Sequence, residues 1–262
     1  MQFGLRAILP HSNTPARNAS RSDAGGPSLR VAGFEDEDED EDEAPCESCT
    51  SRGSLHAHEY RAFKIQSNET GTQPLVIGSA HLAVAGREKG TIDPSTDRVL
   101  TFYGGPKTTV PPGSPVLSDP VELSVQPLTK LAISLYITRD SGASVMHLVG
   151  QETGYLSSSG DETSAVVIAD ASTVAERYYL TGVEVCSADS VGSIVCLGDS
   201  ITDGRGSTPD ADRRWPDRLA ERLNEQGVRL GVVNAGISGN RILHAGYRAM
   251  ADSIDLKLFT RP

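Results

Sequence analysis

The chain has 262 residues, a length that suits one large domain or two of modest size. Its formal net charge of −11 is concentrated in residues 35–43, an unbroken acidic run, and the remainder holds 26 acidic against 24 basic residues. This balance gives no basic patch and excludes an electrostatic case for nucleic acid as a partner. No apolar stretch reaches about 18 residues, so no membrane span is expected.

Residues 1–59 are rich in Ser, Pro, Gly, Arg and acidic residues and show neither strand nor helix periodicity. Low hydrophobicity beside a dense charge block predicts a disordered acidic tail, either a solvated linker or an interaction element. The apolar piece at residues 7–9 stops at Pro10, whereas a secretory signal needs roughly 7 to 15 apolar residues. We predict no signal peptide, and localisation stays open.

Two of the four cysteines, Cys46 and Cys49, form a C-x-x-C within this tail, with His56 and His58 close behind. A zinc site of the Cys2His2 kind is one interpretation. We favour two thiols in a flexible segment, because no packed scaffold is predicted around them. Cys196 lies in an apolar stretch and is expected to be a small core residue.

Residues 60–188 show short alternating strand patterns separated by Gly- and Pro-containing turns. The clearest are "VELSV" at 121–125 and "LAISLYI" at 131–137, where apolar residues occupy every second position. Further candidate strands lie at residues 74–86, 98–103, 143–150, 164–169 and 177–185. Strands at intervals of roughly ten residues, with almost no helical pattern, predict an antiparallel β-sandwich domain.

From residue 189 to 262 the pattern changes to that of an α/β domain. The apolar run at 191–198 predicts a strand buried on both faces. The stretch 215–227, "WPDRLAERLNEQG", predicts a helix that begins with Pro216 in its first position, carries one apolar stripe of Trp215, Leu219 and Leu223, and ends at Gly227. A second strand is predicted over 228–236, which gives the order strand, helix, strand.

Two turns of this unit carry chemistry. Ser200 follows the first predicted strand, and the Gly-rich stretch 234–239 follows the second. The carboxyl ends of parallel strands meet at one edge of a sheet, so both turns should open there. A serine hydroxyl facing backbone N–H donors is the outline of an acyl-transfer site. Gly-Asp-Ser is also an ordinary turn composition, so plain structural punctuation remains the alternative on this pattern alone.

The pair "LGDSITDG" and "VVNAGISGNRIL", in this order with a helix between, closely resembles the first two sequence blocks of the SGNH (GDSL-type) hydrolases. The resemblance implies serine esterases or lipases on a flavodoxin-like α/β fold. The stretch before it resembles the β-domain of a microbial, often secreted, two-domain subgroup, so the likeness covers roughly residues 60–245. It implies a small-molecule, glycan or lipid acyl ester as substrate and no cofactor.

The resemblance also assigns roles to individual residues. Ser200 matches the nucleophile of the family, and its backbone N–H matches one oxyanion donor. Gly239 matches the glycine whose N–H is a second donor. Asp199 matches the acidic residue that supports the shape of the nucleophile turn.

Two further blocks of the family, Gly-x-Asn-Asp and Asp-x-x-His, are absent: none of the six histidines has an aspartate three positions before it. A serine hydroxyl needs a base within about 3 Å. His244 follows Gly239 and could substitute, but we expect it on the surface or at a helix start, and we expect His147 to be packed or hydrogen-bonded within the β-sandwich. We therefore expect a C-terminally truncated hydrolase that is inactive alone.

Two other functions stay open on the sequence. The β-sandwich could be a non-catalytic module that binds carbohydrate, although aromatic residues are only 5% of the chain and form no row suited to sugar stacking. The acidic run at 35–43 could bind a partner protein. The acyl and alcohol groups of a substrate, and the oligomeric state, are not specified by any pattern.

Overall fold

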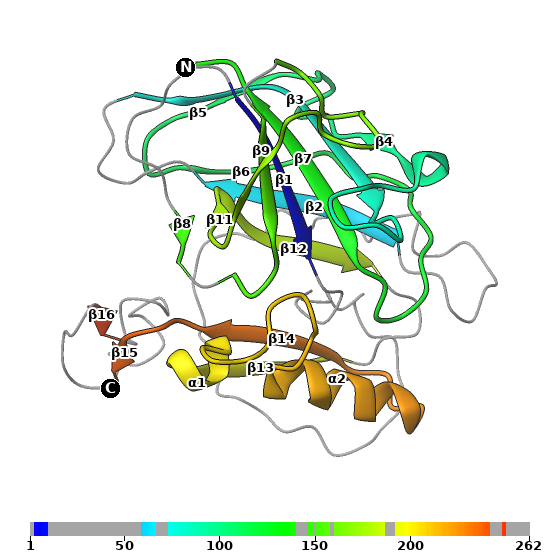
Figure 1. Cartoon of the computed structure of the whole chain (residues 1–262), viewed down its shortest axis with the longest axis vertical. Helices are drawn as coiled ribbons and strands as arrows, with labels where there is room; N and C mark the ends of the chain where they lie inside the picture. The colour runs from blue at the N-terminus through cyan, green and yellow to red at the C-terminus, as the bar shows by residue number, and fades with distance from the viewer. Residues whose placement is uncertain are drawn as a thin grey trace, which may run out of the picture.

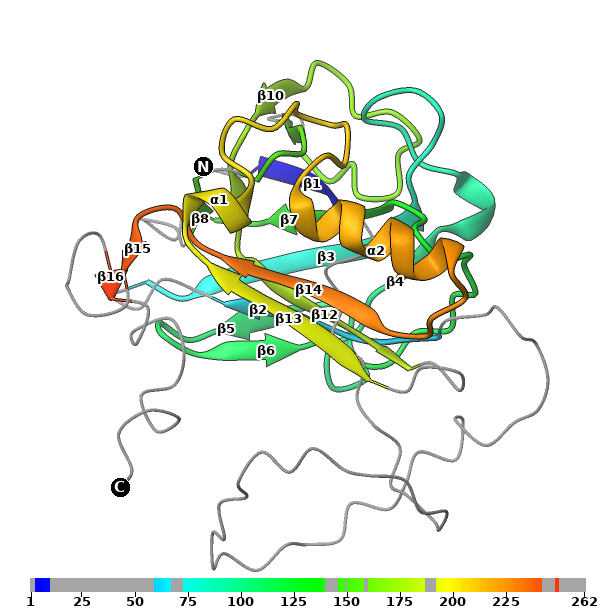
Figure 2. The same ribbon diagram turned by 90° about the horizontal axis from the view of Figure 1, so that it is seen from below.

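A computed structural model describes residues 3–9, 59–66, 73–139, 146–148, 150–157, 160–186, 192–241 and 248–249. Of residues 3–9, 59–66, 184–186 and 248–249 the backbone alone is described. The described chain is rich in strands and has few helices (Figure 1). The strands before residue 187 form one body, and the helices lie with the last strands in a second, smaller one (Figures 1 and 2).

The larger sheet of the strand-rich part is antiparallel and runs in the order β10-β9-β1-β7-β3-β4, with β5 also paired to β3. Its bounds are β1 Phe3–Leu9, β3 Leu75–Val84, β4 Arg98–Val99, β5 Thr108–Val110, β7 Leu131–Ile137, β9 Gly154–Ser157 and β10 Ser172–Val174. A second sheet has the order β12-β2-β6, from β2 Glu59–Gln66, β6 Pro115–Leu117 and β12 Leu180–Cys186. β8 Met146–His147 pairs with β11 Arg177–Tyr178, and a 3-10 turn covers Pro94–Thr96.

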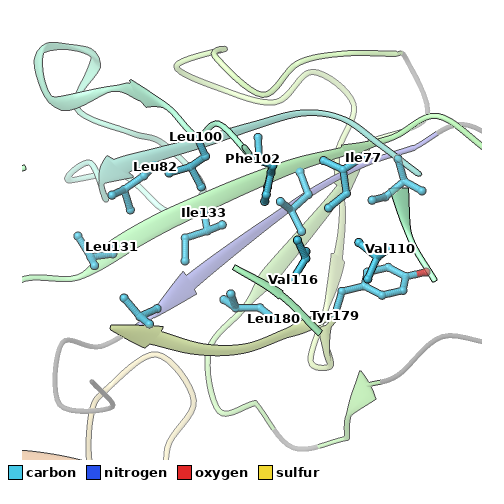
Figure 3. Packing of buried hydrophobic residues seen from close by; sticks show 14 of the residues in the cluster. Ile77, Leu82, Leu100, Phe102, Val110, Val116, Leu131, Ile133, Tyr179 and Leu180 are labelled. Atoms are coloured by element: carbon cyan, nitrogen blue, oxygen red, sulfur yellow. The ribbon is translucent and has the colours of Figure 1, made fainter. Parts of the chain in front are cut away.

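One apolar cluster lies between the two sheets (Figure 3). Leu131, Ile133 and Leu135 of β7 are at most 2% exposed, and they share the cluster with Val116 of β6 and Leu180 of β12. Every second side chain of β7 points to this core because a strand alternates its faces. A strand-rich part with a core between two sheets is consistent with the expected β-sandwich.

Several strand predictions agree with the structure and others do not. The segments 74–86, 98–103 and 131–137 contain β3, β4 and β7. "VELSV" at 121–125 is no ladder strand: Leu123 and Val125 are buried as loop residues, so its alternation reflects burial and not pairing. Residues 164–169 contribute one isolated bridge, Thr91 to Val167. The stretch 177–185 is divided into β11 and β12 by Tyr179, whose φ is +60°.

The N-terminal prediction also needs a correction. Within the expected tail of residues 1–59, Phe3–Leu9 is strand β1, which pairs with β7 on one side and with β9 on the other. The alternation of Phe3, Leu5, Ala7 and Leu9 was the available signal, and the polar composition of the following residues masked it. The acidic run and the C-x-x-C lie outside the described residues.

The smaller body is a strand–helix–strand unit, as the sequence predicts. β13 (Ser193–Gly198) and β14 (Gly231–Gly236) pair in parallel, with Ser193 opposite Gly231 and Gly198 opposite Gly236. Between them lie α1 (Ser200–Asp203) and α2 (Trp215–Glu225). A two-residue parallel pair, β15 Asn240–Arg241 with β16 Arg248–Ala249, follows.

The packing of this unit differs from the prediction on one point. Helix α2 covers one face of the strand pair, where its Ala220 meets Cys196 and Val232 in a small core. The opposite face of β13 is not covered by described residues, and Val195 is 62% exposed there. The continuous apolar run therefore does not mark burial on both faces. Trp215, expected in the apolar stripe, is 46% exposed, and Pro216 takes the second helical position, since Arg214 is the N-cap.

We predict that Ile133→Ala lowers the free energy of unfolding by about 2 to 5 kcal/mol, because it leaves a cavity in the main core. Val195→Ala, an aliphatic truncation on the exposed face of β13, should change it by less than about 0.5 kcal/mol. Urea unfolding followed by circular dichroism measures both. Equal effects of the two substitutions would contradict this account of the core.

Candidate active site

Ser200 stands at the turn between β13 and α1. The strand ends at Gly198, Asp199 caps the helix, and Ser200 is its first residue. The Asp199 carboxylate accepts a hydrogen bond from the backbone N–H of Ile201 at 3.0 Å. The helix ends after one turn at Gly204, which has a left-handed φ of +102°. This capping bond fixes the turn that carries Ser200.

The ends of the two parallel strands approach α1 closely. A Cβ atom on Gly236 would lie 2.2 Å from the backbone nitrogen of Asp203, and one on Gly198 would lie 2.1 Å from the Thr202 hydroxyl oxygen. The Asn234 side chain joins the same elements, because its Nδ2 donates to the Thr202 carbonyl at 2.8 Å and its Oδ1 accepts from the Gly236 N–H at 2.9 Å. Only glycine at 198 and 236 permits this contact.

The turn that carries Gly239 is tied to strand β13, which leads into Ser200. The backbone N–H of Ile237 donates to the Gly198 carbonyl at 3.1 Å. The N–H of Asn240 then donates back to the Ile237 carbonyl at 3.0 Å, and Gly239 takes a φ of +90° within this turn. Ser200 and Gly239 thus follow the carboxyl ends of two paired strands at one edge, as the sequence predicts.

Asp203, the last residue of α1, is a site residue that the sequence motifs do not indicate. Its side chain is 5% exposed. One carboxylate oxygen accepts from both the backbone N–H and the hydroxyl of Ser238, at 3.0 and 2.7 Å. The other lies 2.6 Å from Nε2 of His147, in strand β8. The available signal was its spacing, because a residue three positions after Ser200 lies on the same side of a helix.

The electrostatics at Asp203 favour the ionised form. Burial disfavours the charge, but the hydrogen bonds from His147 and Ser238, together with the charge of His147, outweigh it and hold the pKa of Asp203 below its ordinary value. The Asp203 carboxylate, which accepts three hydrogen bonds, is therefore held against the turn that carries Gly239.

The loop between α1 and α2 reaches toward the strand-rich part (Figure 1). At its tip, Asp210 accepts from Lys89 Nζ at 2.7 Å and from both the backbone N–H and the hydroxyl of Thr153, at 2.7 and 2.9 Å. The Asp210 N–H donates to the Gln151 carbonyl at 2.9 Å. Burial opposes the charge, yet the bonds from Lys89 and Thr153 hold the pKa of Asp210 below its ordinary value. These contacts anchor the loop that follows α1.

The other end of this loop is fixed by a buried ion pair. The Arg214 guanidinium donates to both carboxylate oxygens of Asp217, at 2.7 and 2.9 Å, and the Arg214 N–H donates to the same carboxylate at 3.0 Å. Both side chains are at most 5% exposed. A Cβ on Gly204 would lie 2.2 Å from Arg214 Cγ, so the glycine after α1 admits this side chain.

A lysine shared by two carboxylates lies at the same interface. Lys130 Nζ is 2.9 Å from Glu152 and 3.0 Å from Asp212. Glu152 is 6% exposed, and burial together with the neighbouring Asp212 raises its pKa to about 7, although the bond from Lys130 opposes the shift. Glu152 therefore holds its proton into the neutral range.

The structure locates the histidines differently from the expectation. His147 lies in the strand-rich part, but its partner is Asp203 of α1 and not a group of the β-sandwich. No described residue hydrogen-bonds to the Ser200 hydroxyl. His244, Cys46, Cys49, His56 and His58 lie outside the described residues. Within the described segments there is no group of three or more His, Cys, Asp or Glu placed to hold a metal ion, and no helix long and apolar enough to cross a membrane.

Comparison with known families decides the lineage of this site. Residues 196–258 match the sequence model of the GDSL-like lipase/acylhydrolase family. This segment is similar to that family. The match begins within β13 and contains both Ser200 and Gly239. It confirms at the level of the family the resemblance seen in "LGDSITDG" and "VVNAGISGNRIL", while the two-domain subgroup stays a prediction. No curated protein matches the chain.

We predict that Gly236→Ala destabilises the GDSL-like segment by about 1 to 3 kcal/mol, because the added methyl group must push α1 away from β14. Gly182→Ala is the matched control, since Gly182 also lies in a strand and a Cβ there meets nothing within 4 Å. Thermal unfolding of both variants tests the claim. A smaller loss in Gly236→Ala than in the control would refute it.

Ionisation of Glu152 should make the stability of the protein depend on pH. The Glu152 pKa of about 7 lies above the ordinary 4.5, so the folded protein keeps a proton that the unfolded chain releases. The free energy of unfolding should therefore fall as the pH rises from about 5 to 8. In Glu152→Gln this fall should be smaller, by about 1 to 2 kcal/mol over the same range. Urea titrations at a series of pH values measure it, and a fall as steep as that of the parent chain would contradict the assignment.

Proposed function

We propose that the GDSL-like segment carries a serine ester hydrolase site with Ser200 as its nucleophile. The backbone N–H groups of Ser200 and Gly239 are the oxyanion donors, and Asp199 holds the turn by its capping bond. The observation that carries the proposal is the hydrogen bond from Ile237 to Gly198, because it joins the Gly239 turn to the strand that leads into Ser200. The family match over both motifs supports the same assignment.

The chemistry follows from this arrangement. The Ser200 oxygen attacks the ester carbonyl carbon, and its proton passes to a base. The negative charge that develops on the carbonyl oxygen is stabilised by the two N–H donors, a contribution of about 10²- to 10³-fold in rate for each donor. The tetrahedral species expels the alcohol, which takes up a proton, and an acyl-serine remains. Water then attacks the acyl group, and the acid and free Ser200 are released.

We further propose that turnover by this chain is slow. The attack needs a base hydrogen-bonded to Ser200, and no described residue makes that bond. The sequence holds no Asp-x-x-His block to supply a base with an orienting carboxylate. Without a base, the Ser200 hydroxyl is a poor nucleophile at neutral pH, so its attack on the ester is slow.

The domain assignment is part of the proposal. Residues 60–188 form a β-sandwich domain, residues 189–262 belong to an SGNH-type domain, and the substrate is a small-molecule, glycan or lipid acyl ester. The contacts of Asp210 with Lys89 and Thr153 support a sandwich that serves the hydrolase segment as a scaffold.

Ser200→Ala tests the nucleophile. With an activated short-chain ester such as p-nitrophenyl acetate at high protein concentration, we expect slow hydrolysis by the parent chain. The alanine variant should reduce it to the rate without protein. Ser207→Ala, which changes a serine of the following loop, should leave the rate unchanged. Hydrolysis that persists in Ser200→Ala would exclude Ser200 as the nucleophile, and a fast, Ser200-dependent rate would overturn the claim that the base is lacking.

A further inference from the structure

We propose that His147, a residue of the strand-rich part, is a positioning residue for the oxyanion turn of the hydrolase segment. It acts through Asp203, whose carboxylate binds His147 with one oxygen and Ser238 with the other. The meaning of this contact for catalysis rests on the proposed function. The contacts themselves do not depend on it.

A continuous chain of short contacts leads from β8 to the turn. His147 Nε2 is 2.6 Å from Asp203 Oδ1. Asp203 Oδ2 accepts from the Ser238 hydroxyl at 2.7 Å and from the Ser238 N–H at 3.0 Å. Ser238 directly precedes Gly239, and its N–H is held on the carboxylate. The direction of the peptide group that bears the Gly239 N–H is therefore set from Asp203.

The protonation states follow from the acceptor. Asp203 is ionised, because its hydrogen bonds hold its pKa below the ordinary value despite its burial. An ionised carboxylate only accepts hydrogen bonds, so Nε2 of His147 must carry a proton and donate. Removing this donor leaves a buried charge with one partner fewer, a loss that favours a different side-chain rotamer or a wetter site.

The position of His147 is itself determined by the strand-rich part. β8 pairs with β11, and His147 lies directly opposite Arg177. The pKa of Arg177 lies below its ordinary value, because burial and the charge of Arg214 lower it more than the charges of Asp203 and Glu152 raise it. The contact between His147 and Asp203 therefore lies among charged side chains of the strand-rich part and of the smaller body.

Asp203 belongs to the same helix turn as Ser200. One residue thus joins the helix that bears the nucleophile to the turn that bears the oxyanion glycine, and His147 fixes the carboxylate between them. We expect loss of His147 to loosen the Gly239 turn without moving β13, since the bond from Ile237 to Gly198 does not involve it.

Amide hydrogen exchange of Ser238 and Gly239, measured by NMR on the full chain, tests the inference. In His147→Leu we expect their exchange to accelerate by about tenfold or more. In His147→Gln, which keeps a donor at a similar reach, exchange should stay near that of the parent chain. His81→Leu is the matched control: it removes a second histidine–aspartate contact among the described residues, His81 with Asp97 at 3.0 Å, and should leave Ser238 and Gly239 unchanged.

Unchanged exchange at Ser238 and Gly239 in a folded His147→Leu chain would overturn the inference, as would equal acceleration in the glutamine variant. If the leucine variant does not fold, the imidazole ¹⁵N spectrum of the parent chain decides. A protonated Nε2 on His147 supports the inference, and an unprotonated one overturns it.

These readouts separate the two proposals. Failure of Ser200→Ala to affect ester hydrolysis removes the proposed function and leaves the exchange result intact. If Ser200-dependent hydrolysis is present, His147→Leu should lower kcat with KM unchanged, because the oxyanion donors act on the transition state. His147→Gln should restore kcat.

Discussion

The buried carboxylate of Asp203 joins three parts of the chain that are distant in sequence. It belongs to the one-turn helix after β13, it accepts two hydrogen bonds from the turn after β14, and it meets His147 of β8. Taking an ionised carboxyl group out of water is costly unless donors surround it. The three donors meet that requirement, and in doing so they hold the helix and both neighbouring segments in one arrangement. The geometry around Ser200 depends on this group.

The contact between the two bodies is largely polar. Lys89, Lys130 and Thr153 of the strand-rich part meet Asp210 and Asp212 of the loop between the helices. Apolar contacts have little directional preference, whereas charge-assisted hydrogen bonds of 2.7 to 3.0 Å fix the position of the loop against the strand-rich part. This polar contact also has a cost in stability, because the carboxylates of Glu152 and Asp212 share the single ammonium group of Lys130. The arrangement favours a defined orientation over maximal stability.

The sequence was most informative where local pattern and structure coincide. The alternation in residues 131–137 predicts β7, and the order of apolar runs predicts β13, α2 and β14, because each of these segments buries its own periodic face. It was less informative where pairing depends on distant partners. β1 is defined by strands that lie well over a hundred residues later, and Leu123 and Val125 of "VELSV" are buried outside any strand. At the site, Ser200 and Gly239 follow from motif and topology, whereas the link between Asp203 and His147 joins residues 56 positions apart and only appears once the two bodies meet.

The place of β1 has a consequence for how the protein is made. This strand is synthesised before both of its neighbours, β7 and β9, which lie within residues 131–157. At a synthesis rate of about 5 to 20 residues per second, Phe3–Leu9 waits for roughly seven to thirty seconds before both partners exist. During this interval β1 has no partner within its own chain, and its unpaired edges could pair with another chain. A low concentration of nascent chains should therefore favour the native pairing of β1.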